Sequence, residues 1–101
     1  MLIEGEISSA EYYITKSTDN RGSKSNISEV IFYLYGKDYQ FLIRKNIGHD
    51  YHYEPHQKIQ HQLHQSDTAK VWIEKSDINN YKPDIYRLSA DNIEIISIDD
   101  V

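Results

Sequence analysis

The chain has 101 residues, contains no cysteine and carries a formal net charge of -5 at pH 7. A chain of this length builds one hydrophobic core, here a single domain over residues 1–101, and without cysteine it can hold neither disulfides nor cysteine-ligated metal centres. The excess of acidic residues disfavours nucleic acid as a partner, and the lack of a signal sequence or a membrane-length apolar run leads us to expect a cytoplasmic protein.

The first predicted strand runs from Leu2 to Thr15. Its apolar and small residues occupy odd-numbered positions at first, namely Ile3, Gly5 and Ile7. Later they occupy even-numbered positions, namely Ala10, Tyr12 and Ile14. Because side chains alternate between the faces of a strand, this change predicts a bulge or bend near Ser8 and Ser9. The polar stretch 17–26 that follows is rich in turn-forming residues and is predicted to be a mobile loop.

A hairpin is predicted next. Residues 27–35 alternate, with Val30, Phe32 and Leu34 on one side. Gly36 to Asp38 then forms a turn that leads into a partner strand with Tyr39, Phe41 and Ile43 on one face. We expect Val30, Phe32 and Leu34 to face the core.

Residues 46–65 permit two interpretations. Pro55 can occupy the first turn of a helix, with Ile59 and Leu63 four residues apart on one face. Ile59, His61 and Leu63 would equally share one face of a strand. We favour one short helix, or an irregular segment, around residues 54–65.

Three further strands are predicted at residues 69–73, 85–89 and 93–98, with Val71 and Ile73 in the core. The whole pattern predicts a mostly β fold, a small antiparallel barrel of five to six strands. The predicted order is three strands, a short helix and then two or three strands, as in the OB fold. An SH3-like barrel is the alternative.

Two segments resemble the later strands of small bacterial β-barrel domains of unknown function. They are Ser66 to Lys75, with the sequence SDTAKVWIEK, and Ile85 to Leu88, with the sequence IYRL. The resemblance covers about a third of the chain. It implies a fold and carries no functional residue with it.

All five histidines lie within sixteen residues, at His49, His52, His56, His61 and His64. Spacings of three and four residues place imidazoles side by side on a helix, where they could bind zinc, nickel or copper. The glutamate that accompanies paired histidines in metalloproteases is missing, so a solvated polar connection is the favoured interpretation and a metal site the alternative.

The tyrosine-rich hairpin is the best candidate for a binding surface. Tyr33, Tyr35 and Tyr39, together with Trp72, could form an outward platform for bases or sugar rings, flanked by Arg44. Alternation places part of this set in the core, and the acidic balance removes the electrostatic attraction that single-strand-binding barrels use.

No catalytic motif is present. No serine stands in a glycine-flanked elbow, and the glycines form no phosphate-binding loop. We therefore expect a non-enzymatic binding module without a cofactor, which engages a protein partner or a second copy of itself through the tyrosine-rich face or the mobile loop. The rivals are an acidic inhibitor or immunity-type protein with a carboxylate-rich region over residues 84–101, a histidine metal site, and a barrel for single strands or sugars.

Overall fold

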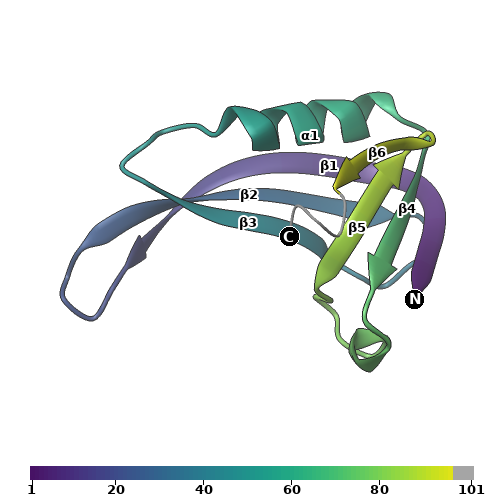
Figure 1. Ribbon diagram of the computed structural model, residues 1–101, viewed down its shortest axis with the longest axis horizontal. Coiled ribbons are helices and arrows are strands. Elements are labelled where there is room, and N and C mark those ends of the chain that lie inside the picture. Colours follow the sequence, from purple (N-terminus) through teal and green to yellow (C-terminus); the bar gives the residue numbers. More distant parts are fainter. Residues whose placement is uncertain (97–101) are drawn as a thin grey trace.

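A computed structural model describes residues 1–96 (Figure 1). Six antiparallel strands form one curled half-barrel, and a single long helix separates the first three strands from the last three. The strands are β1 (Leu2–Thr18), β2 (Lys24–Leu34), β3 (Phe41–Gly48), β4 (Thr68–Ile73), β5 (Ile85–Ala90) and β6 (Ile93–Ile96). The helices are α1 (Glu54–Gln65) and a 3-10 turn, η1 (Lys75–Asp77). The predicted mostly β fold is confirmed.

The order of the sheet is β3-β2-β1-β4-β5-β6, so β1 lies between its two halves. Its first residues pair with β4, and its later residues pair with β2. The pairing with β2 shifts between Ile7 and Ser9, where the parity of the sequence changes. The predicted bulge is confirmed, and it lets one strand present a core face to both halves.

The hairpin between β1 and β2 is longer than the sequence predicts. Thr18 pairs with Lys24, so only residues 19–23 remain as a turn, and half of the loop predicted over 17–26 is strand. The reason is that both faces of this arm are mostly exposed, and an exposed strand needs no apolar alternation. Figure 1 shows the arm projecting away from the body of the molecule.

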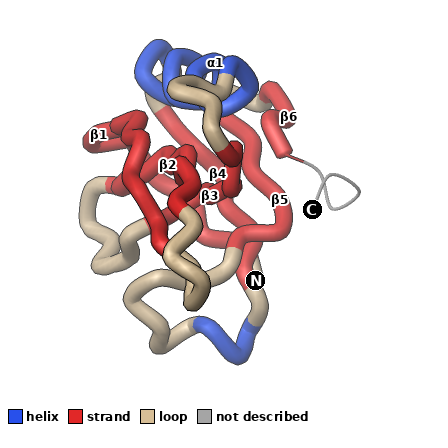
Figure 2. The backbone as a smooth tube through the Cα atoms, turned by 90° about the vertical axis from the view of Figure 1, so that its left-hand side faces the viewer, coloured by secondary structure: helices blue, strands red, loops and turns tan. Residues whose placement is uncertain are grey.

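Helix α1 covers the concave face of the sheet, where it packs on β1 and β2 (Figure 2). Pro55 lies in its first turn, where a missing N–H is tolerated. Leu63 is fully buried and Ile59 packs against the core, as the helical interpretation requires. The Gln60 side chain also donates to the carbonyl of Ala10 at 2.9 Å.

The core lies between the sheet and α1. Phe32 and Phe41 are fully buried on neighbouring strands, and their rings stack with centroids 5.1 Å apart. The predicted core residues all lie in this core, namely Val30, Phe32, Leu34, Val71 and Ile73.

The second half of the sheet ends in the β5–β6 hairpin. Asp91 and Asn92 form its turn, both with positive φ. The strand predicted over 93–98 is observed from Ile93 to Ile96, and its last residues lie outside the described part of the chain. Among residues 1–96, no helix has the length and apolarity that crossing a membrane requires.

Candidate functional site

The half-barrel is open between β3 and β5. These strands touch but do not pair, so within residues 1–96 the sheet ends at β3 on one side and at β6 on the other. A pocket of about 550 Å³ lies along this opening, and we call it the slot. Residues from β3, from the start of α1, from β5 and from β6 line it, namely Leu42, Ile43, Arg44, Lys45, Tyr53, Pro55, His56, Ile59, Ile85 and Ile95.

The slot follows the edge of β3. Four consecutive residues of that strand, 42–45, line it. Successive side chains of a strand point to opposite faces, so a cavity on one face of the sheet would be lined by every second residue. Contact with all four residues places the slot beside the backbone edge of β3.

Part of the slot lining is apolar. This part consists of one isoleucine from each of four elements, namely Ile43, Ile59, Ile85 and Ile95. All four are partly buried and pack against the main core. An apolar side chain that entered the slot would therefore be covered on several sides, and burial of this kind stabilises a complex.

The rest of the lining includes polar and basic residues. Lys45 lies opposite the fully buried Ser28 and so points toward the concave face. Its ammonium donates to the hydroxyl of Tyr53 at 3.0 Å and lies 5.0 Å from the centre of that ring. The backbone N–H of Tyr53 donates to the hydroxyl of Tyr12 at 2.9 Å, which ties this end of the helix to β1.

His56 connects the helix to the sheet. Its Nδ1 lies 2.8 Å from the hydroxyl oxygen of Ser28, and both residues are buried. Burial lowers the pKa of His56 below its ordinary value of 6.5, and Lys45 lowers it further, while the hydrogen bond to Ser28 acts in the opposite direction. The imidazole is therefore neutral at pH 7.

Ser28 and His56 are the residue types of a serine hydrolase triad, but their arrangement does not fit that role. Ser28 has no exposed surface, so its hydroxyl cannot reach a substrate. Within the described residues no carboxylate forms a hydrogen bond or an ion pair with His56. The arrangement acts as a structural link that positions the first turn of α1 beside the slot.

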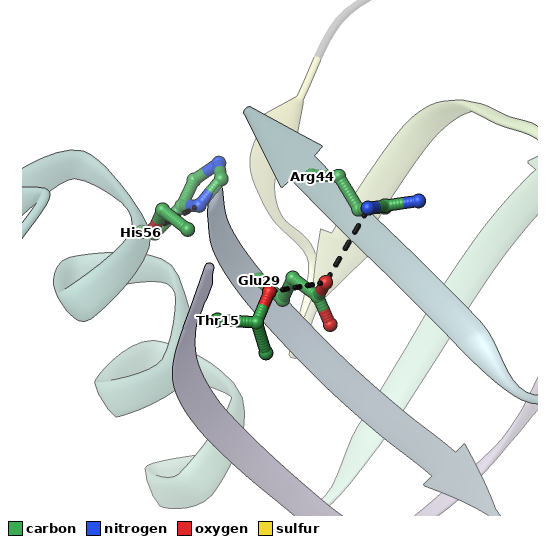
Figure 3. Close-up of polar contacts among 5 residues, drawn as sticks. Thr15, Glu29, Arg44 and His56 are labelled. Atoms are coloured by element: carbon green, nitrogen blue, oxygen red, sulfur yellow. Dashed lines mark hydrogen bonds and ion pairs between the residues drawn. The ribbon is translucent and has the colours of Figure 1, made fainter. Parts of the chain in front are cut away.

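Arg44 belongs to a polar row across three strands (Figure 3). Its Nε lies 3.4 Å from the Oε1 of Glu29, which also accepts a hydrogen bond from the hydroxyl of Thr15 at 3.2 Å. Figure 3 shows the far end of the guanidinium pointing away from Glu29. Arg44 is thus held in place while part of its hydrogen-bonding capacity faces outward.

The predicted tyrosine platform is dispersed in the structure. Tyr33 lies on the face of β2 opposite to Phe32, with its hydroxyl accepting from the Gln40 side chain at 2.8 Å. Tyr35 is exposed beyond the end of β2, and Tyr39 packs against Phe41 and donates to the carbonyl of Ile78 at 2.5 Å.

Trp72 belongs to the other half of the sheet. It pairs with Leu2 and Arg87, and the guanidinium of Arg87 lies 4.6 Å from its ring centre. Tyr33, in contrast, pairs with Ser9 beyond the bulge. Of the five residues predicted to bind a ligand, only Arg44 lines the slot.

The five histidines also lie apart. His49 and His52 are exposed before α1, and His61 and His64 are exposed on the helix, whereas His56 is buried. Within residues 1–96, no group of three or more histidine, aspartate or glutamate residues is arranged to hold a metal ion. The prediction of a wholly solvated connection fails at His56, whose ring faces the sheet because it begins the buried stripe of the helix. Of the acidic region over 84–101, residues 97–101 lie outside the described part of the chain.

Sequence reasoning missed the slot as a site. Ile59 carried a signal, because its helical spacing from Leu63 places it on the inner face of α1. Ile43, Ile85 and Ile95 look like ordinary strand residues in the sequence. Their common role follows from the gap between β3 and β5, which no local pattern indicates.

No known protein family matches this sequence, and no match is found among curated proteins or solved structures. The site is therefore interpreted from its own geometry.

Proposed function

We propose that this chain is a non-enzymatic binding module that holds a segment of a protein partner in the slot. One observation carries the proposal: a pocket with four isoleucines in its lining lies beside β3, a strand that within residues 1–96 pairs on one side only. Binding sites combine an apolar surface with a few placed polar groups, and the slot has both.

A segment of protein fits this site better than a compact small molecule. The slot lies along β3, whose edge is unpaired within residues 1–96, so an extended segment can lie beside this strand. Its lining comes from elements that are far apart in the sequence and belong to both halves of the sheet. Protein segments commonly bind at such sheet edges.

The tyrosine-rich face gives less support. Tyr33 and Tyr39 already use their hydroxyls within the chain, and Trp72 is covered on one side by Arg87. The tip of the β1–β2 hairpin has few apolar side chains to bury against a partner.

The test compares two matched variants of β6. Ile95→Glu places a charge among the apolar residues that line the slot, whereas Ile93→Glu makes the same change at an exposed residue outside the slot. Each tagged protein, after circular dichroism has shown that it is folded, is used to capture partners from an extract of the source cells. A partner that is retained by the unaltered chain and by Ile93→Glu but lost with Ile95→Glu supports the proposal.

Equal retention of all partners by the two variants would contradict the proposal. Light scattering of the purified proteins addresses a second copy of the chain as the partner. Self-association that is lost with Ile95→Glu alone would make the slot an interface between copies.

A further inference from the structure

We infer that the slot binds an extended acidic segment, which adds a strand to the free edge of β3. This inference rests on the proposed function and specifies the chemistry of the partner. Three independent features of the described residues carry it: the unpaired edge, the local charge and the order of side chains along β3.

The first feature is the edge itself. Within residues 1–96, β3 forms its ladder with β2 alone, and no other strand pairs with it. An edge strand presents a row of backbone N–H and C=O groups that an incoming strand can satisfy. Because the slot lies beside this row, an occupant meets both the backbone edge of β3 and the isoleucine side chains of the lining.

The second feature is charge. Arg44 and Lys45 both line the slot, and among residues 1–96 no acidic residue does so. The chain as a whole carries a net charge of -5, so this edge is a basic region in an acidic protein. Lys45 contacts a neutral hydroxyl, and Arg44 shares Glu29 with Thr15, so both cations retain capacity for a carboxylate. Complementary charge favours an acidic partner and selects against a basic one.

The third feature is the order of the side chains. Ile43 and Lys45 lie opposite Val30 and Ser28, which are buried, and so point inward, whereas Arg44 points to the other face. Residues directly opposite each other on paired strands share a face. The best partner therefore carries an apolar residue opposite Ile43 and acidic residues opposite Arg44 and Lys45.

The same charges disfavour a second copy of β3 as the added strand. Antiparallel pairing of two such edges would bring arginine and lysine from both chains close together. Like charges directly opposite each other on a sheet are destabilising. The edge is thus protected from pairing with itself and remains open to an acidic strand.

The test uses three labelled peptides of equal length in fluorescence anisotropy. The acidic probe is acetyl-Thr-Val-Thr-Ile-Glu-Glu-Val-Thr-Val-amide, and the two controls carry Gln-Gln or Lys-Lys in place of Glu-Glu. We expect the acidic peptide to bind at least about tenfold more tightly than the glutamine peptide at low salt, because two charge pairs distinguish them. The difference should shrink as salt screens those pairs.

The charge reversal Arg44→Glu with Lys45→Glu should abolish the preference for the acidic peptide and create one for the lysine peptide. The matched control is Lys16→Glu with Lys24→Glu, which changes the net charge equally at exposed residues of the β1–β2 hairpin. This control should keep the original order of affinities. Arg44→Glu places a carboxylate directly opposite Glu29, so circular dichroism first establishes that each double variant is folded. The single change Lys45→Glu keeps the ion pair between Arg44 and Glu29 and should weaken the preference for the acidic peptide in the same direction.

Hydrogen exchange separates strand addition from simple charge attraction. Amides of β3 that face away from β2 should gain protection when the acidic peptide is bound, because they acquire backbone partners. Equal affinity for all three peptides, an unchanged exchange pattern in β3, or no binding of the acidic peptide at about 1 mM would overturn the inference.

The two proposals fail separately. Suppose that a natural partner is lost with Ile95→Glu but binds equally well after the charges of Arg44 and Lys45 are reversed. The slot is then still a binding site, and the inference of an acidic strand is wrong. Loss of partner binding on both changes supports the inference.

Discussion

The Nδ1 of His56 lies 2.8 Å from the hydroxyl oxygen of Ser28, inside the molecule. This contact joins the first turn of α1 to β2 at one end of the slot. Because it involves a titratable group whose pKa is lowered by burial, it connects the stability of the fold to pH.

The free energy of unfolding should fall as the pH drops below about 6.5, the pKa of an unfolded histidine. The folded pKa of His56 is lower, so the unfolded chain binds the proton first. The stabilisation is therefore fully present above pH 6.5 and is lost toward the folded pKa, with a slope of at most about 1.4 kcal/mol per pH unit for one proton. Urea denaturation at several pH values measures this slope.

His56→Gln should flatten the pH dependence. His61→Gln makes the same change at an exposed position of the same helix and should leave the decline as it is in the unaltered chain. If both variants follow the unaltered chain, His56 does not cause the decline.

Phe32→Ala should lower the free energy of unfolding by about 3 to 5 kcal/mol, since it removes a fully buried ring that stacks on Phe41. Tyr13→Ala, at a residue that is 46% exposed, should cost less than about 1 kcal/mol. Chemical denaturation of the two variants gives both values. A small loss at Phe32 would mean that the core can close around the gap.

Gly5→Ala should stabilise the protein by about 0.5 kcal/mol, because alanine reduces the conformational entropy of the unfolded chain. Gly5 does not have a positive φ, and an added Cβ would meet the Cβ of Leu34 at 3.6 Å, an ordinary contact. Thermal unfolding should show a higher midpoint. A clear decrease would show that β1 and β2 approach each other too closely for a methyl group at this point.

Asp91→Gly should cost about 1 to 2 kcal/mol through the loss of hydrogen bonds to a carboxylate, since glycine adopts the positive φ of 48° at this residue without strain. Its Oδ1 accepts from the backbone N–H groups of Asp67 and Thr68, each at 3.1 Å, and so holds the start of β4. Asn92→Gly, at the next residue of the turn, should keep the stability, since glycine readily adopts the positive φ of 68° found there. Comparable losses in the two variants would assign the effect to the turn itself.

The elements that could be predicted from the sequence are those whose side chains alternate between a buried and an exposed face. The parity change in β1 located the bulge, and the spacing of Ile59 and Leu63 indicated the helix. The ends of β1 and β2 escaped prediction because side chains exposed on both faces leave no pattern. The slot escaped it because its four isoleucines lie in separate elements and meet only in the folded chain.

The bend in β1 has a mechanical consequence. The two halves of the sheet share this one strand, which has β2 and β3 on one side and β4, β5 and β6 on the other, and β3 and β5 come together across the opening without pairing. The angle of the backbone at Ile7 to Ser9 therefore sets the separation of β3 and β5, and with it the width of the slot. We expect substitutions in this bend to change which side chains the slot accepts, although they lie outside its lining.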